Sequence, residues 1–276
     1  MRTVSGGGID LRVDDVDGGK ITSVIVGGRE WIAPSFPRDP SARYGGAGGW
    51  DECVPTVGEC TLANGTRLLD HGDAWRRPWE VVDSEPDLLD MTVGLPSLDL
   101  TLRRTIQRSA SGLTFRYSVT TRSAEDVPLL WSAHPLFIAP RGTRIVVRNS
   151  RGTEHYPRHR RRRVPLRGSI DRIRSGTALK MFLTWSSSWA AVEHADGARL
   201  TMSWDPARVR ELGLYWDAGV FATHSVVAIE PTTGAHDLAS AVTDRLPHVN
   251  VRRPLSWWLH LAYSPPRTAR YGGGAG

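Results

Sequence analysis

Four short segments of this chain carry side chains that can move protons or bind hydroxyl groups. His71, His134 and Glu230 each precede a Gly or Pro, residues typical of turns and strand ends. Histidine, with an ordinary pKa of about 6.5, exchanges protons near neutral pH, and a partly buried carboxylate is a useful base. An acid and a base on opposite sides of a hemiacetal are what sugar ring opening requires. The segments are Gly49-Trp50-Asp51-Glu52-Cys53-Val54-Pro55, His71-Gly72-Asp73-Ala74-Trp75-Arg76-Arg77-Pro78-Trp79-Glu80, Ser132-Ala133-His134-Pro135-Leu136-Phe137 and Glu230-Pro231-Thr232-Thr233-Gly234-Ala235.

The acid and base candidates each follow an apolar run. His134 comes after Leu129–Trp131 and before Pro135, and a residue that precedes proline is pushed to extended geometry. We therefore expect His134 on or beside a buried strand, either as a general acid or as a core histidine with its nitrogens satisfied. Glu230 ends the run Ser225–Ile229, where partial burial would raise its pKa and suit it to act as a base. A solvated charge at a strand end is the alternative for Glu230.

Residues near the second segment could bind a substrate. His71 lies in the turn-like sequence Asp70-His71-Gly72-Asp73 and is either a hydroxyl donor or a plain turn residue. Arg76 and Arg77 could hold hydroxyls or an anion through paired hydrogen bonds, and we favour Arg76 for the pocket. The eleven tryptophans, Trp50 among them, offer flat faces to a sugar ring but serve equally well as core residues.

Alternation of apolar and polar residues dominates the rest of the chain. Leu98–Arg103 and Leu113–Thr120 both alternate with a period of two, which is typical of strands with one buried face. No stretch has a convincing helical period, and Asp205–Glu211 predicts a single capped turn. Many short strands separated by turns predict a large antiparallel β-sandwich, an all-β fold. Further predicted strands are Ile21–Val26, Arg144–Val147, Ala190–Glu193, Ser225–Ile229 and Trp257–Ala262.

Length and composition fit one large domain. The chain has 276 residues, of which 40% are hydrophobic, so it can bury a sizeable core. All-β domains of this length are often single. We expect one domain over residues 1–266 and a flexible tail over 267–276. Met1–Asp17 lacks an apolar signal core, and no apolar run approaches the roughly 20 residues of a membrane helix. The sequence therefore predicts a cytoplasmic protein without a membrane partner, and its oligomeric state is left open.

The basic character of the chain comes from one segment. The net charge is +6, and five arginines between Arg158 and Arg163 account for most of it, so that the remainder is nearly neutral. We expect His155–Arg167 to form an exposed, irregular excursion. Binding of nucleic acid or another polyanion there is a third hypothesis, but the absence of aromatic residues within Arg160–Arg163 disfavours base stacking. Nucleic acid is therefore not the expected partner.

Metal and cofactor sites are not expected. His155 and His159 are four residues apart, but Pro157 between them disfavours the helix that would place both on one face. No Gly-rich loop joins a strand to a helix, so no nucleotide-binding fold is indicated. Cys53 and Cys60 form no CxxC pair and are either two buried thiols or a single bridge.

Taken together, the segments resemble the aldose 1-epimerase (galactose mutarotase-like) superfamily. The stretch from His71 to Glu80 is similar to the family's His-Gly-x-Ala-Arg segment, although a Trp displaces the arginine, so that Arg76 or Arg77 is its equivalent. The other similar segments are Gly48–Pro55, an early Gly-Gly…Pro turn, Ser132–Phe137, the second histidine strand, Glu230–Gly234, the late Glu-Pro strand end, and Leu255–Tyr263, the closing strand. The resemblance spans most of Lys20–Tyr263.

The resemblance implies a many-stranded β-sandwich with an open sugar cleft. Members interconvert the α and β anomers of aldoses without a metal or cofactor. By the matching segments, the resemblance implies that Glu230 is the base, His134 the acid and His71 a donor to a hydroxyl or to the ring oxygen. Lys180 stands where many members carry an aspartate, which would favour an anionic sugar derivative, and Asp217 could replace the lost acceptor. A carbohydrate-binding protein without catalysis on the same fold is the alternative.

Overall fold

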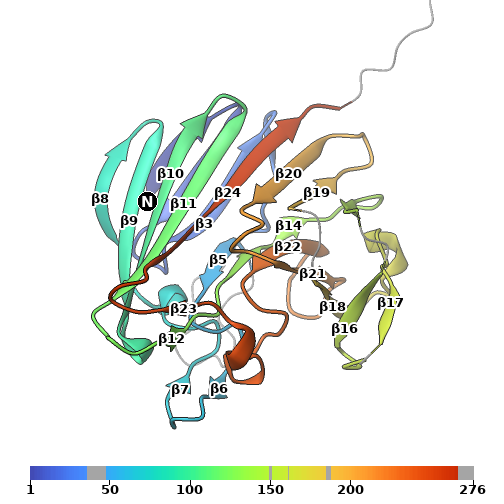
Figure 1. The fold of residues 1–276 in the computed structure, drawn as a ribbon. Helices are drawn as coiled ribbons and strands as arrows, with labels where there is room; N and C mark the ends of the chain where they lie inside the picture. Colours follow the sequence, from blue (N-terminus) through green and yellow to red (C-terminus); the bar gives the residue numbers. More distant parts are fainter. Residues whose placement is uncertain (36–47, 149–150, 161, 185–187, 267–276) are drawn as a thin grey trace, which may run out of the picture.

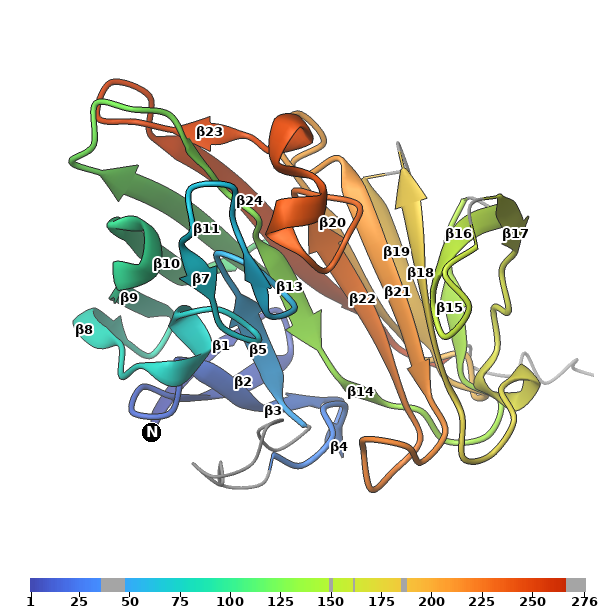
Figure 2. The same cartoon turned by 90° about the horizontal axis from the view of Figure 1, so that it is seen from below.

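Two antiparallel β-sheets face each other across a common core. The structure, a computed structural model, describes residues 1–35, 48–148, 151–160, 162–184 and 188–266. The predicted tail, 267–276, lies outside these residues. Strands dominate the described chain, and the all-β antiparallel sandwich expected from the sequence is confirmed (Figures 1 and 2).

The larger sheet has twelve strands and carries the candidate site. In spatial order it comprises β1 (Arg2–Gly6), β2 (Ile9–Asp14), β3 (Lys20–Val26), β5 (Trp50–Cys53), β13 (Ser132–Pro135), β22 (Val226–Thr232), β21 (Glu211–Asp217), β18 (Ala178–Thr184), β16 (Arg151–Tyr156) and β17 (Arg163–Pro165), with β4 (Arg29–Glu30) beside β3 and β14 (Phe137–Ile138) beside β22.

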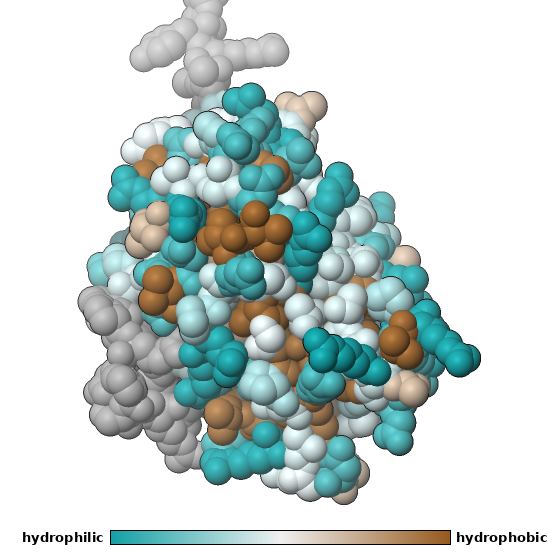
Figure 3. All heavy atoms as spheres, turned by 90° about the vertical axis from the view of Figure 1, so that its left-hand side faces the viewer, coloured by the Kyte–Doolittle hydropathy of each residue, from teal (hydrophilic) through white to brown (hydrophobic). Residues whose placement is uncertain are grey.

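The second sheet has eight strands and packs on the first. Figure 3 looks at the molecule from the side of β8 and β9, where hydrophilic side chains are interspersed with small apolar patches. The strands are, in spatial order, β15 (Arg144–Val146), β19 (Trp189–Glu193), β20 (Arg199–Trp204), β24 (Leu255–Ser264), β11 (Gly112–Thr121), β10 (Leu100–Ser109), β9 (Leu88–Leu95) and β8 (Glu80–Glu85).

Short elements complete the described chain. None of its helices is long enough, or apolar enough, to cross a membrane. Two strand pairs lie apart from the large sheets, β6 (Cys60–Thr61) with β7 (Arg67–Leu68) and β12 (Val127–Pro128) with β23 (His248–Val249). The helices are single 3-10 turns: η1 (Ala74–Arg76), η2 (Pro96–Leu98), η3 (Ile170–Arg172), η4 (Ala239–Ala241) and η5 (Thr243–Arg245).

The core follows from the alternation in the sequence. On β11, Phe115, Tyr117 and Val119 are buried while the residues between them are partly or fully exposed. Because successive side chains of a strand point to opposite faces, each sheet presents one apolar face to the other. Trp50 of the larger sheet stacks on Phe115 of the smaller one, with ring centres 5.0 Å apart. This contact joins the two sheets directly.

A buried ion pair also joins the two sheets. Glu52 on β5 and Arg104 on β10 are both fully buried, and Arg104 Nη1 lies 3.1 Å from Glu52 Oε1. The hydroxyl of Tyr117 donates to the same carboxylate oxygen at 2.8 Å. The indole of Trp131 donates to the other oxygen, Oε2, at 2.8 Å. Every carboxylate oxygen of Glu52 therefore has a protein partner.

Two expectations are corrected in detail. The segment His155–Arg167 is not irregular throughout, because β16 ends within it, β17 lies inside it, and the two strands form an antiparallel hairpin. Leu98 belongs to η2, and the strand that it was expected to open begins at Leu100. For the cysteines, the structure holds the first of the two alternatives: Cys53 is buried, Cys60 is half-buried, and both are free thiols.

Other predictions are confirmed. The strands expected from apolar and β-branched residues are β3, β15, β19, β22 and β24, each within a few residues of its predicted bounds. The turn predicted at Asp205 is also present, because its side chain accepts a hydrogen bond from the backbone N–H of Ala207 at 2.9 Å.

Candidate active site

The larger sheet directs a row of polar side chains away from the core. Glu52 enters the core between the sheets, so its neighbour Asp51 faces the opposite side. His134 on β13 is paired in register with Asp51 and faces the same way. Glu230 on β22 and Lys180 on β18 join them on this face. A cavity of about 490 Å³ opens over this row, lined by Asp51, His134 and Lys180 among others.

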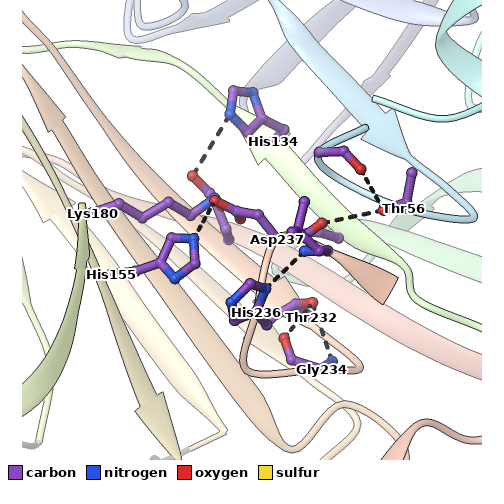
Figure 4. Close-up of polar contacts among 12 residues, drawn as sticks. Thr56, His134, His155, Lys180, Thr232, Gly234, His236 and Asp237 are labelled. Carbon is purple, nitrogen blue, oxygen red and sulfur yellow. Dashed lines mark hydrogen bonds and ion pairs between the residues drawn. The ribbon is translucent and has the colours of Figure 1, made fainter. Parts of the chain in front are cut away.

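Glu230 lies behind Lys180 and His134 and is 1% exposed. Its Oε2 lies 2.6 Å from Lys180 Nζ, and its Oε1 lies 3.7 Å from His134 Nε2 (Figure 4). Gly213 on β21 makes room for this carboxylate, because a Cβ there would stand 3.0 Å from Oε2. A residue with no side chain is thus placed directly beside the candidate base.

Asp237 completes an ion network with Lys180. Its Oδ1 lies 2.7 Å from Lys180 Nζ, and its Oδ2 lies 3.2 Å from His155 Nε2. Lys180 is buried, so its ammonium is shared by the carboxylates of Glu230 and Asp237 (Figure 4). This pairing with two carboxylates leaves Lys180 little free charge with which to select an anionic sugar.

Four buried carboxylate oxygens at the site have no hydrogen-bond partner among the described residues: both oxygens of Glu230, Oδ1 of Asp237 and Oδ1 of Asp51. Oε2 of Glu230 and Oδ1 of Asp237 are ion-paired with Lys180, which leaves Oε1 of Glu230 and Oδ1 of Asp51 for other donors. The other oxygen of Asp51, Oδ2, lies 3.3 Å from Lys20 Nζ. Buried acceptors are nearly always satisfied in folded proteins, and leaving one unsatisfied costs about 1–3 kcal/mol. Oε1 of Glu230 and Oδ1 of Asp51 are therefore suited to accept hydrogen bonds from hydroxyl groups of a ligand.

His71 and His134 stand next to each other at the cavity. Their ring centres are 5.4 Å apart, and His71 Nδ1 lies 2.8 Å from Asp70 Oδ2. His71 has a φ of 58°, in the left-handed region that residues other than glycine rarely adopt. Such backbone strain concentrates at functional sites. The Asp70 carboxylate holds the His71 ring in one orientation.

The surroundings shift the pKa values of the central groups. Burial raises the pKa of Glu230, and the Lys180 ammonium offsets part of that rise. Burial lowers the pKa of His134 well below its ordinary value, and nearby positive charges lower it further. Burial would also lower the pKa of Lys180, but Asp237 and Glu230 outweigh it and hold that pKa above its ordinary value. Burial would raise the pKa of Asp237, but Lys180 and His155 together outweigh it and hold that pKa below its ordinary value.

A β-bulge turns two consecutive residues into the cavity. On β16, Glu154 is opposite Met181 and Tyr156 is opposite Lys180, so the register shifts between them at His155. A bulge places two residues opposite one and re-aims a side chain. His155 and Tyr156 consequently both line the cavity, although neighbouring residues of a regular strand face opposite sides.

Three histidine rings gather at this end of the cavity. The ring of His155 lies 5.2 Å from that of His159 and 4.5 Å from that of His236, measured between centres. Pro157 was expected to keep His155 and His159 apart by preventing a helix. A turn after β16 brings the two rings together without a helix. Within the described ranges, however, no group of three or more His, Cys, Asp or Glu side chains is arranged to hold a metal ion.

The remaining predicted site residues lie in different places. Asp217 lines the cavity, but its carboxylate accepts hydrogen bonds from the backbone N–H groups of its own loop, including that of Phe221 at 2.9 Å. Trp50 is fully buried in the core on Phe115 and does not reach the cavity. Arg76 and Arg77 are not among the lining residues.

Arg76 nevertheless supports the cavity wall. Its guanidinium lies 4.9 Å from the ring centre of Trp75 and donates to the backbone carbonyl of Asp70 at 3.0 Å. Both Trp75 and Asp70 line the cavity. Arg77 is exposed.

Several lining residues were not singled out from the sequence, namely Asp51, Asp70, His155, Tyr215 and Asp237. Asp51 lies inside a recognised segment, where strand alternation beside Glu52 was an available signal. Asp70 directly precedes the His71 segment, and the Asp-His pair was the signal there. Asp237 lies beyond the Glu-Pro segment in a loop, and the bulge at His155 leaves no trace in the apolar pattern.

Comparison with known proteins identifies the fold. No protein-family model and no curated protein matches the sequence. A protein of Synechocystis has a TM-score of 0.78 at 19% identity, covering 95% of this chain and 96% of that one. A candidate aldose 1-epimerase of Escherichia coli has a TM-score of 0.72 at 18% identity, with 96% and 98% covered.

A galactose mutarotase-like protein of Lactobacillus casei has a TM-score of 0.72 at 14% identity, covering 96% of this chain and 100% of that one. The fold of this chain is therefore galactose mutarotase-like. The resemblance predicted from the sequence is confirmed at the level of the fold, over nearly the whole length of both chains.

Proposed function

We propose that this protein is a mutarotase-like isomerase that interconverts the α and β anomers of an aldose. The observation that carries the proposal is the buried, unsatisfied oxygen Oε1 of Glu230, which lies 3.7 Å from Nε2 of His134. His134 lines the cavity, and Glu230 lies directly behind it. A buried base with a free acceptor atom beside a histidine is the pair that hemiacetal opening requires. The candidate epimerase and mutarotase-like structures that share the fold support the same chemistry.

In the proposed reaction, Glu230 takes the proton of the C1 hydroxyl while His134 gives a proton to the ring oxygen. The C1–O5 bond breaks, the electron pair of the former O–H bond forms the carbonyl, and the open-chain aldehyde rotates about C1–C2. Closure on the other face of the carbonyl reverses both proton transfers, so that each group returns to its starting state. Each proton transfer by a positioned side chain contributes roughly 10²–10⁴-fold to the rate.

The pKa shifts define which protonation state reacts. Reaction requires Glu230 ionised and His134 charged, whereas burial raises the pKa of Glu230 and lowers that of His134. Burial therefore disfavours the reactive protonation state at both groups, and the two groups titrate as a coupled pair. His71, held by Asp70, is the neighbouring ring best placed to donate a hydrogen bond to a sugar hydroxyl or to the ring oxygen.

We further propose that the substrate is a neutral sugar. Asp51, Asp70 and Asp237 line the cavity as hydroxyl acceptors, and the lining lysine, Lys180, is already paired. A second anion would meet this excess of carboxylates. The faces of Trp75 and Tyr215 at the same cavity suit the apolar C–H side of a sugar ring.

Saturation-transfer NMR of anomer exchange tests the proposal. Wild type and Glu230→Gln are compared on a panel of neutral aldoses, their 6-phosphates and uronates. We expect wild type to accelerate exchange of at least one neutral aldose and Glu230→Gln to lose that acceleration. Binding of a sugar to both proteins without any acceleration would support a non-catalytic carbohydrate-binding protein instead. Faster exchange of the anionic sugars would overturn the neutral-substrate part.

A further inference from the structure

A second cavity, of about 780 Å³, lies on the other side of β16 and β18 from the sugar cleft. Glu154 and Met181, which are paired in register, line this cavity, whereas His155 and Lys180 on the same strands line the cleft. The two cavities are therefore separated by a single layer of strand. In Figure 2 the β16–β17 hairpin stands at the end of the molecule far from β8. We call this second cavity the arginine groove, defined by β16, β17 and the segment 166–181.

Positive charge is concentrated in the arginine groove. Eight arginines line it, and Glu154 is its one carboxylate among the described residues. Arg160 Nε lies 3.2 Å from Glu154, and Arg158 Nε lies 3.9 Å from it. One negative charge is thus shared by two arginines, and the groove keeps a large excess of positive charge.

The hairpin holds two of these arginines across the strand pair. Arg151 donates to the backbone carbonyl of Arg163, and Arg163 donates to that of Arg151, each at 2.9 Å. These bonds order the side chains without neutralising them. Guanidinium groups in a concave surface repel one another, and concave walls of low dielectric strengthen their combined field. A bound anion would relieve this repulsion.

The segment around η3 contributes further cations to the arginine groove. Arg167, Arg172 and Arg174 line the groove on or near η3, and no ion pair with a carboxylate joins them among the described residues. Arg162 from the hairpin faces the same cavity. Charge presented from two walls of a cavity suits an anion that carries several negative groups, because each guanidinium can bind a phosphate oxygen pair in a bidentate manner.

The lining chemistry also limits the kind of anion. Among the described residues, the uncharged side chains that line the groove are aliphatic, methionine, proline or threonine, such as Pro157, Leu166 and Ile173, and none is aromatic. Recognition of single-stranded nucleic acid depends on stacking of bases on aromatic side chains. The groove volume is within the range of about 300–1,000 Å³ that small-molecule sites have. A compact anion without a base fits these features better than a polynucleotide.

We propose that the arginine groove binds a small anion that carries several phosphate groups and no aromatic base. This site is independent of the sugar cleft and does not rest on the proposed isomerase activity. Its ligand meets guanidinium groups from the hairpin and from the η3 segment at once, so that binding requires both walls.

Isothermal titration with inorganic tripolyphosphate tests this proposal on the full chain. The groove variant Arg167→Ser/Arg172→Ser/Arg174→Ser removes three charges from one wall. The control variant Arg12→Ser/Arg122→Ser/Arg252→Ser removes three exposed arginines elsewhere and gives the same net charge. We expect wild type and the control to bind tripolyphosphate, and the logarithm of the binding constant to fall linearly with the logarithm of the salt concentration. The groove variant should bind at least about tenfold more weakly.

Two further arms keep the proposal falsifiable. Circular dichroism and thermal unfolding check whether the groove variant is folded. If it is not folded, the single variant Arg162→Ser tests the contribution of the hairpin instead. Equal weakening in the groove and control variants would show unspecific charge attraction and overturn the site. Binding of a DNA duplex or single strand that is lost in the groove variant, with no binding of tripolyphosphate, would overturn the proposed ligand in favour of nucleic acid.

Discussion

Two buried carboxylates in this protein, Glu52 and Glu230, have similar surroundings and different consequences. Each is at most 1% exposed, each faces a cationic side chain, and burial raises the pKa of both. Glu52 has hydrogen-bond donors on both oxygens and lies between the sheets. Glu230 has an unsatisfied oxygen and lies beside a cavity. A perturbed pKa alone therefore does not mark an active site.

The difference lies in what each carboxylate still lacks. Arg104, Tyr117 and Trp131 complete the hydrogen bonding of Glu52, so the protein itself uses its full capacity. Glu230 keeps one acceptor atom for something outside the described chain. Incomplete satisfaction next to open space is the more specific indicator of function, because buried polar groups are otherwise satisfied.

The largest expected effect is a loss of anomer exchange when Glu230, the carboxylate beside the cavity, is replaced. Glu230→Gln removes the proposed base while keeping the shape, and we expect anomer exchange to fall roughly 10²–10⁴-fold. Measurement by saturation-transfer NMR, with the thermal unfolding midpoint as a check of folding, gives the comparison. Retention of most of the wild-type rate would contradict the assigned role of Glu230.

The second prediction concerns stability. Arg104→Met leaves the buried charge of Glu52 without its cation, which we expect to lower the free energy of unfolding by about 3–5 kcal/mol. Urea unfolding measures this loss. The double variant with Glu52→Gln serves as the control and should recover part of it. If Arg104→Met abolished exchange in a protein of unchanged stability, the comparison between the two networks would fail.

The third prediction is a displacement of the pH–rate profile. The Lys180 ammonium lowers the pKa of Glu230 and also that of His134. In Lys180→Met both pKa values rise, so both limbs of the pH–rate profile move to higher pH. Rates measured across pH, with Lys180→Arg as the charge-keeping control, test the sign. A shift toward acid would mean that Lys180 does not act on this pair.

The smallest expected effect tests how tightly the protein packs around Glu230. In Gly213→Ala the new Cβ would stand 3.0 Å from Glu230 Oε2, so the carboxylate must shift slightly. We expect exchange to slow roughly tenfold, since misplacement of a catalytic group by about 1 Å costs about 10²-fold. Gly94→Ala is the matched control, because a Cβ there meets no atom within 4 Å. Equal rates in the two variants would exclude a tight fit around Glu230.

Local patterns were sufficient to predict the fold and to single out His134 and Glu230, whose roles stay predictions. Strand alternation located β10 and β11, and the side chains of His134 and Glu230 lie together in the structure. Trp50 was predicted to contact the substrate but lies in the core. It neighbours Asp51 on β5, and since Asp51 faces the cavity, Trp50 faces the opposite side. One domain over residues 1–266 and a cytoplasmic location stay predictions.

Long-range pairing accounts for most of what the sequence could not indicate. Lys180 meets Glu230 and Asp237 from strands and loops that are distant along the chain, so its charge balance had no local signature. The bulge at His155 changes the facing of residues without changing their polarity. The arginine run was visible as a charge excess, but the concavity around it depends on how the η3 segment packs beside the hairpin.

The position of β17 has a consequence for how copies of this protein behave beside one another. β17 is the last strand of the larger sheet, and the outer strand of a sheet offers unpaired backbone groups to a strand from another molecule. Here the edge is only three residues long, begins at Arg163 and ends at Pro165, which has no N–H to donate. Brevity, charge and proline together make this edge a poor template for intermolecular sheet growth and so guard the protein against aggregation.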